Sequence, residues 1–245
     1  MQLLAIDTST SWCSVALSLN GQVTQRHELI GTGASQHLLP WINELLRQAN
    51  LTYPDLDAIA VGVGPGAFTG VRLSVSVAQG LAVGAKLPVI PVASIDAMAI
   101  HVARSKSFQA IYPRPDTQFL LALDARMGEV YWARYLLSNT VPTRLGEIAL
   151  SAPKDIDLSG VGYIAGNAIE EYSEYLAKPF SENQMDTQVV PSAQDILQWA
   201  QPLLEAGQTI SVECLEPLYI RNKVALTTEE RHAALHSTPT GRSFG

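Results

Sequence analysis

The pattern of apolar and polar residues divides the chain into two similar halves. An apolar run at residues 3–7 ends in Asp7, and a short polar turn separates it from a second apolar run at residues 13–19. Residues 120–136 repeat this order, with Asp124 in the place of Asp7. Two strand–turn–strand units so far apart predict a duplicated α/β domain rather than a short-period repeat. Coincidence between two common patterns is the alternative.

The rest of the first half predicts alternating strands and helices. Residues 22–30 follow a hairpin signal and form an expected strand, and Ser35 is expected to cap a helix that runs to about residue 50. Residues 57–63 and 89–92 are typical of buried strands. Residues 71–86 mix alternating and helical spacing, and we expect one helix that is capped near Thr69. Ser94 is expected to cap the next helix.

The second half continues with a further strand and two helical stretches. Two prolines near residues 108–116 indicate a linker before the repeated unit. A strand is predicted at residues 161–165, a helical stretch at 169–176, and a helix that begins at Ser192. The predicted domains are therefore 1–107 and 108–225, with a frayed tail at 226–245 and a last helix that packs back on the first domain.

Composition limits the classes of function. The 245 residues are 47% hydrophobic and carry a formal charge of −7, with scattered basic residues. Nucleic-acid binding without a partner needs clustered Lys and Arg, so a stand-alone RNA-binding module is disfavoured. No apolar run reaches about 18 residues and no signal peptide is expected at the N-terminus. With two cysteines, the composition favours a cytoplasmic protein and no contact with membranes.

The loop at residues 64–72 (GPGAFTGVR) is the most informative single segment. Three glycines and a proline follow an apolar strand and precede the predicted helix. Such a loop lets the backbone approach another group closely. Two kinds of group fit this geometry, a phosphate or another polypeptide, and the loop alone does not choose between them.

Three motifs in order carry a resemblance to a known family. Residues 4–10 (LAIDTST), 64–72 and 123–131 (LDARMGEVY) together resemble the TsaB family, also called YeaZ, over residues 1–225. The resemblance implies the α/β fold of actin, sugar kinases and Hsp70 (ASKHA), with two related subdomains that each hold a central mixed sheet. It also implies a non-catalytic subunit that pairs with TsaD in synthesis of threonylcarbamoyladenosine (t6A) at position 37 of tRNAs reading ANN codons. TsaE is the further implied partner, with a homodimer when the chain is alone and tRNA contacted only through the complex.

The resemblance also bears on catalysis. Catalytic relatives bind a metal through a His-x-x-x-His pair, whereas His101 stands alone in the corresponding region. The pair His232 and His236 has the right spacing but lies in the tail. We therefore expect no catalytic residues, no metal site and no required cofactor. Because carboxylates at such strand ends hold Mg²⁺ near ATP in kinase-like members, the alternative is an independent ATP-dependent kinase or ATPase.

Two sets of candidate residues follow. The first is a weak or vestigial ATP or ADP site, at or near the partner interface, formed by Asp7, Thr8, Ser9, Asp124 and Gly166. The second is a dimerisation surface on the helices near 35–50 and 69–86, formed by His37, Leu38, Trp41, Ile42, Leu45, Arg72, Ser76, Gln79, Gly80 and Val83. The alternative for the second set is that these side chains are all core.

Overall fold

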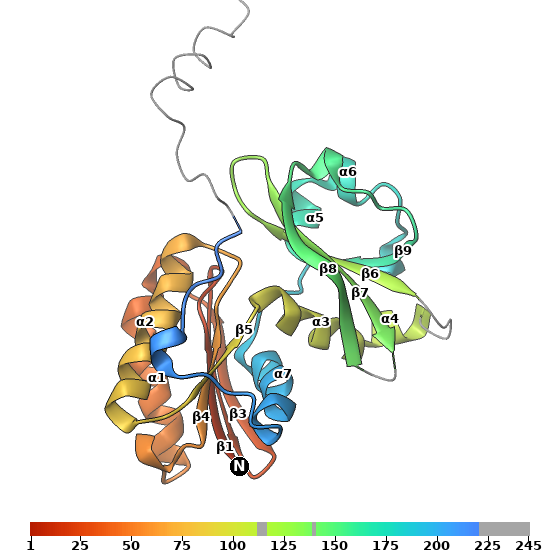
Figure 1. The fold of residues 1–245 in the computed structure, drawn as a ribbon. Coiled ribbons are helices and arrows are strands. Elements are labelled where there is room, and N and C mark those ends of the chain that lie inside the picture. The colour runs from red at the N-terminus through yellow and green to blue at the C-terminus, as the bar shows by residue number, and fades with distance from the viewer. Residues whose placement is uncertain (112–116, 139–140, 221–245) are drawn as a thin grey trace, which may run out of the picture.

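A computed structural model describes residues 1–111, 117–138 and 141–220. The chain forms two α/β units, each built on a five-stranded mixed sheet (Figure 1). The strands of the first sheet are β1 (Gln2–Asp7), β2 (Trp12–Leu19), β3 (Gln22–Leu29), β4 (Ala58–Gly62) and β5 (Val89–Val92). Those of the second are β6 (Gln118–Asp124), β7 (Val130–Ser138), β8 (Val141–Ser151), β9 (Val161–Ala165) and β10 (Met185–Asp186).

The two sheets have the same topology, which confirms the predicted duplication. Their strand orders are β3-β2-β1-β4-β5 and, read in the same direction, β8-β7-β6-β9-β10. In each sheet the first three strands in sequence are antiparallel and the last two are parallel to the first. Coincidence between two hairpins does not produce five matched strands, so the ASKHA architecture of two related subdomains is confirmed.

Helices cover both faces of each sheet. The helices are α1 (Ala34–Gln48), α2 (Phe68–Ala85), α3 (Ser94–Arg104), α4 (Lys106–Ile111), α5 (Ala168–Glu171), α6 (Ser173–Leu176) and α7 (Ala193–Glu205). Helices α1 and α2 bury the first sheet on one face, and α7 returns from the second half to cover the other face. Helix α3 lies between the two sheets and contributes Ala97 to the core of the first unit and Met98 to the core of the second. Because α3 serves both cores, it joins the two units.

Of the four predicted helix starts, those at Ser35 and Ser94 are wrong, and the one near Thr69 is off by a single residue. Helix α1 begins at Ala34 with Gly33 as its N-cap, so Ser35 lies inside the helix and does not cap it. Helix α2 is one helix, as predicted, but it begins at Phe68 ahead of Thr69. The Ser94 hydroxyl donates to Asp7 rather than capping α3. The helix start predicted at Ser192 is confirmed, since the Ser192 side chain accepts a hydrogen bond from the Asp195 amide at the start of α7.

The expected linker at residues 108–116 is wrong at its first residue. Phe108 is fully buried and its ring packs against Phe119 and Tyr163, with centroids 5.0 and 5.2 Å apart. An aromatic ring in that position adds to the core of the second unit, so the segment continues as α4 through Ile111. Residues 112–116 and the predicted tail lie outside the described residues.

Two further segments complete the picture. The helical stretch predicted at 169–176 is divided into α5 and α6, because Tyr172 between them leaves the helical region with φ −121° and ψ 41°. After α7 the chain crosses back over α2, and the Leu218 amide donates to the Val63 carbonyl at 2.8 Å. No helix in the described part of the chain is both long and apolar enough to cross a bilayer.

Candidate functional site

Asp7, at the end of β1, is buried and fully bonded within the chain. Its carboxylate accepts hydrogen bonds from the Ser9 amide at 2.8 Å, the Ser9 hydroxyl at 2.7 Å and the Ser94 hydroxyl at 2.7 Å. Only 1% of the residue is exposed, and this burial raises the pKa of the Asp7 carboxyl. The carboxylate therefore fixes the turn after β1 to the start of α3.

Three of the four glycines in residues 62–70 pack directly against this turn, while Gly64 packs against Val71 and the Leu218 carbonyl. A Cβ atom on Gly62 would lie 1.8 Å from Asp7 Oδ2, one on Gly66 would lie 2.1 Å from the Ser9 carbonyl oxygen, and one on Gly70 would lie 1.9 Å from the Thr8 carbonyl oxygen. The Thr8 hydroxyl donates to the Gly70 carbonyl at 2.6 Å. The loop was predicted to approach a phosphate or another polypeptide, whereas the group that its glycines contact is the first turn of this same chain.

Asp124, at the end of β6, has a different environment from Asp7. It accepts hydrogen bonds from the Arg126 amide at 2.9 Å and the Tyr172 hydroxyl at 3.1 Å, and Arg126 Nη1 lies 3.2 Å from its second oxygen. Its own amide donates to the Asn167 side chain at 3.0 Å. The equivalent turn is therefore held by neighbours within the second unit.

The five residues of the predicted nucleotide site do not form one pocket. Ser9 and Asp124 line a cavity of about 80 Å³ between the two turns. Thr8 lines a different cavity of about 450 Å³ beside the first turns of α1 and α2. Asp7 is buried, and Gly166 (φ +121°) packs so closely that a Cβ would lie 2.1 Å from the Ala122 carbonyl oxygen.

Metal-binding chemistry has little basis in the described residues. Within them, no group of three or more His, Cys, Asp or Glu side chains is placed to hold an ion. His101 Nδ1 lies 3.4 Å from Asp195 Oδ2, and this partner raises the pKa of the imidazole. His101 thus links α3 to α7, while His232 and His236 lie outside the described residues.

The predicted dimerisation residues separate into buried and exposed members. Leu38, Trp41, Ile42 and Leu45 are at most 7% exposed, so these four predictions are corrected: their side chains fill the core between α1 and the first sheet. The helix must bury its apolar stripe against the sheet, which leaves its polar face outward.

Helix α2 differs from α1 because some of its small residues, such as Ser76 and Gly80, are exposed. Arg72, Ser76, Gly80 and Val83 are exposed, whereas Gln79 donates to the Leu215 carbonyl at 2.8 Å and is half-buried. On α1, His37 is half-buried beside Trp41. The exposed face of α2 is thus the larger surface that the predicted set offers to a partner.

Sequence reasoning missed two residues that position the Asp turns. Ser94 binds Asp7 from 87 positions away, and Asn167 binds the Asp124 amide from 43 positions away. Asn167 lay next to a predicted site residue, and Ser94 carried a capping signal, but neither pattern indicates a contact with a distant turn.

Comparisons with known proteins place this geometry in a family. The sequence model described as "TsaD: tRNA N6-adenosine threonylcarbamoyltransferase" matches residues 28–234. The protein TsaB of Escherichia coli K12, described as a tRNA threonylcarbamoyladenosine biosynthesis protein, is 38% identical over 92% of this chain and 96% of its own length. The Haemophilus influenzae TsaB is 35% identical over 91% of this chain and 95% of its own length.

Solved structures agree with the sequence relatives. YeaZ from Pseudomonas aeruginosa superimposes with a TM-score of 0.78 at 34% identity, over 89% of this chain and 99% of that one. A second Pseudomonas aeruginosa structure, described as similar to the peptidase YeaZ, gives a TM-score of 0.79 at 34% identity, over 90% and 99%. Sequence and fold agree over nearly the whole length, and the chain therefore belongs to the TsaB (YeaZ) family.

Proposed function

We propose that the chain is a non-catalytic scaffold subunit in the synthesis of t6A at position 37 of tRNA. It pairs with a TsaD subunit, works with the ATPase TsaE, and meets tRNA only through the complex. The names of its TsaB relatives support the pathway, and the match to the TsaD sequence model supports descent from the same ancestral fold as the proposed partner.

One observation carries the non-catalytic part of the proposal. The space between the two Asp turns, where kinase-like members of the fold hold ATP, measures about 80 Å³. Small-molecule sites usually span about 300–1,000 Å³. The glycines that would cradle phosphate contact the Thr8 and Ser9 carbonyls instead. The small volume between the two turns and the close packing of these glycines support a role without nucleotide chemistry in this chain.

The exposed face of α2 supports pairing with another subunit. Ser76 and Gly80 lie one turn apart and let a partner helix approach closely, and Val83 is 64% exposed beside them. Packing an apolar and small-residue surface against a second helix removes that surface from water, which stabilises the complex.

Reconstitution tests the proposal directly. TsaC, TsaD and TsaE are combined with a tRNA that reads an ANN codon, with and without this chain, and t6A is measured by mass spectrometry of nucleosides. We expect modification only when the chain is present. Full modification in its absence would sink the scaffold role.

A second measurement separates the scaffold from the rival kinase or ATPase. Calorimetric titration of the isolated chain with Mg-ATP is expected to give no micromolar binding. Micromolar binding that Asp124→Ala abolishes would instead favour an independent enzyme, because Asp124 lines the small cavity while Asp7 does not.

A further inference from the structure

A second cavity lies where the two units meet, and we name it the junction pocket. It measures about 220 Å³ and is lined mainly by apolar side chains from three segments: Phe68 and Val71 of α2, Ala125 and Tyr131 around the β6–β7 turn, and Leu218 and Ile220 of the returning chain. This volume is below the usual range for a whole small molecule, about 300–1,000 Å³. It suits one large apolar side chain supplied by another protein.

Arg72 lies beside the junction pocket, against Phe68 and Tyr219, which are two of the residues that line it. Its guanidinium carbon lies 3.7 Å from the centre of the Phe68 ring and 5.7 Å from that of Tyr219. Its Nε donates to the Tyr219 hydroxyl at 2.9 Å. Among the described residues no carboxylate lies within ion-pairing distance of the exposed Arg72, so its guanidinium can bind a carboxylate from another protein.

The two rings that hold Arg72 are themselves exposed. Phe68 is 46% exposed and Tyr219 is 50% exposed, with ring centroids 6.1 Å apart. Adjacent exposed aromatic rings beside an arginine have the composition of an energetic hot spot in protein–protein interfaces. A monomer gains nothing from leaving this much aromatic surface in water.

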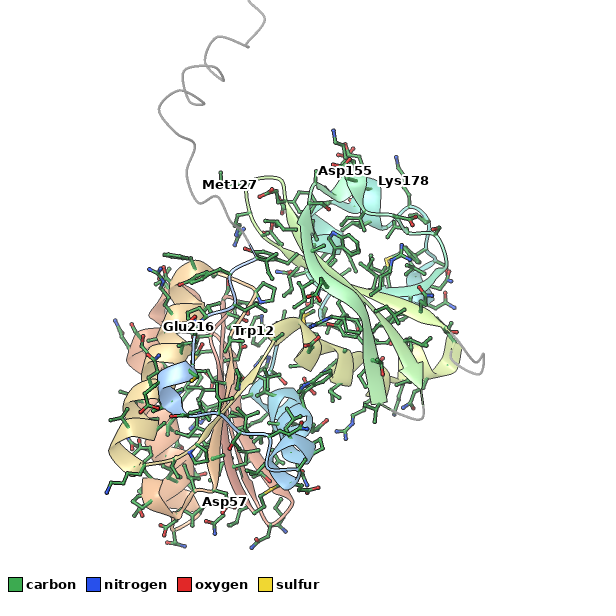
Figure 2. All side chains as sticks on the ribbon, in the orientation of Figure 1. Trp12, Asp57, Met127, Asp155, Lys178 and Glu216 are labelled. Carbon is green, nitrogen blue, oxygen red and sulfur yellow. The ribbon has the colours of Figure 1, made fainter. Side chains whose placement is uncertain are left out.

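The β6–β7 turn adds a second cation and a strained backbone to the same rim. Arg126 (φ 62°) and Met127 (φ 57°) are both non-glycine residues in the left-handed region, which costs energy that the surrounding structure must offset. The Arg126 side chain is 80% exposed, and Met127 is 83% exposed at the tip of the turn (Figure 2). Arg126 is already paired with Asp124, whereas Arg72 has no carboxylate partner among the described residues, so Arg72 is the cation that favours an acidic group on the partner.

We propose that the partner subunit inserts an apolar side chain into the junction pocket and places a neighbouring carboxylate on Arg72. The partner's identity as a TsaD subunit rests on the proposed function, whereas the chemistry of its segment follows from the pocket. Phe68 and Arg72 begin the exposed face of α2, so the junction pocket extends that surface toward the second unit. One partner then contacts both units at once, so its binding depends on their relative orientation.

Binding measurements on full-length variants test the anchor. Affinity for purified TsaD is measured by calorimetry for the wild type and for Phe68→Ala, Arg72→Ala, Arg72→Lys and Tyr219→Phe. We expect Arg72→Ala and Phe68→Ala to weaken binding roughly 10- to 30-fold, and Arg72→Lys to weaken it less because a lysine keeps the charge but loses the fork. Tyr219→Phe keeps the ring and removes the bond to Arg72, so its loss is smaller, about threefold.

Two controls make the measurement specific. Arg104→Ala removes one exposed arginine on α3, away from the junction pocket, and is expected to bind like the wild type. Added salt is expected to weaken the wild type more than Arg72→Ala, because the variant has lost one charge pair. Binding of Arg72→Ala within twofold of the wild type, with unchanged thermal unfolding, would overturn the proposal while leaving the t6A requirement intact.

Cross-linking identifies the occupant independently of variant stability. A photoreactive phenylalanine analogue replaces Met127 in the full chain, the reconstituted complex is irradiated, and joined peptides are sequenced. The proposal expects a TsaD peptide with Asp or Glu near an apolar residue. Cross-links to this chain's own residues 221–245, to a second copy, or to TsaE in place of TsaD would each contradict it.

Discussion

The first and second Asp turns descend from the same strand–turn–strand unit but have opposite environments. Asp7 is 1% exposed, accepts three hydrogen bonds and has three glycines packed around its turn. The Asp124 turn carries Arg126 and Met127 outward in the left-handed region. One copy of a duplicated motif can therefore form a buried turn while the other forms an exposed turn, because the two copies pack against different neighbours.

The largest expected effect tests the packing of the first turn. Gly70→Ala places a Cβ atom 1.9 Å from the Thr8 carbonyl oxygen, so the backbone of the turn or of α2 must shift. We expect a loss of about 3 kcal/mol in the free energy of unfolding, measured by urea denaturation. Gly80→Ala is the matched control, because nothing lies within 4 Å of its Cβ position on the same helix.

The control variant, Gly80→Ala, is expected to change the free energy of unfolding in the opposite direction. In a helix interior alanine is favoured over glycine by about 1 kcal/mol, so the isolated Gly80→Ala chain is expected to be slightly more stable. A Gly70→Ala chain as stable as the wild type would show that the first turn is not as tightly packed as the comparison requires.

The next effect concerns the join between the two copies. Arg144 Nη1 donates to both oxygens of Asp96 on α3, at 2.8 and 2.7 Å, and the Tyr135 hydroxyl donates to the same carboxylate at 2.6 Å. Arg144→Met leaves this largely buried carboxylate without its cation, and we expect a loss of about 2 kcal/mol, less than for a fully buried pair because Arg144 is partly exposed. Chemical denaturation measures it.

The double variant separates charge from packing. Arg144→Met combined with Asp96→Asn removes both charges and is expected to recover part of the stability, because no unpaired carboxylate remains. If the single and double variants lose the same free energy of unfolding, the contact joins the units through packing alone.

The third prediction compares the two aspartates themselves. Asp7→Asn replaces one oxygen of a buried acceptor of three hydrogen bonds with an NH₂ group, which cannot accept. We expect it to cost about 2 kcal/mol, whereas Asp124→Asn is expected to cost about 1 kcal/mol, since Asp124 is less buried. Equal losses in urea denaturation would mean that the two turns are equivalent after all.

The pH dependence of Asp7 has a defined sign. Burial raises its pKa in the folded chain, so its contribution to stability is fully present below the unfolded pKa, near 4. That contribution is lost as pH rises through the folded pKa. The difference in unfolding free energy between the wild type and Asp7→Asn is therefore expected to shrink as pH increases above about 4.

The smallest expected effect lies at His101. Its hydrogen bond to Asp195 raises the imidazole pKa, so the charged form stabilises the fold below the unfolded pKa of about 6.5 and this gain is lost as pH rises through the folded pKa. Because half of the side chain is exposed, the effect should stay below about 1 kcal/mol. Thermal unfolding of His101→Gln, compared with the wild type at pH 5.5 and pH 8, measures it.

His27 provides an internal contrast to His101. Its ring stacks on Trp12 with centroids 4.5 Å apart, and burial lowers its pKa. Protonation of His27 is therefore expected to destabilise the fold as pH falls through the unfolded pKa. A His27→Gln chain that shows the same pH profile as the wild type would contradict this assignment.

The comparison also shows why some sequence predictions failed. Apolar positions such as Leu38 and Trp41 have the same periodicity whether they face a sheet or a partner. They were therefore predicted at an interface, but in the structure they are buried against the first sheet. In contrast, the exposed side of α2 was predicted in part. Ser76 and Gly80 were chosen because small residues allow close helix approach, and both are exposed. The Ser94 contact with Asp7 could not be predicted because nothing local encodes it.

Periodicity, turn residues and three short motifs determined the duplicated α/β organisation and the family of this chain, because strand and helix patterns depend on neighbours in sequence. Which aspartate is buried, what the glycines of residues 62–70 contact, and where a pocket opens at the junction were decided only by tertiary structure. These features depend on contacts between segments as far apart in the sequence as Phe68 and Tyr219, and such contacts form only when those segments pack together in the folded chain.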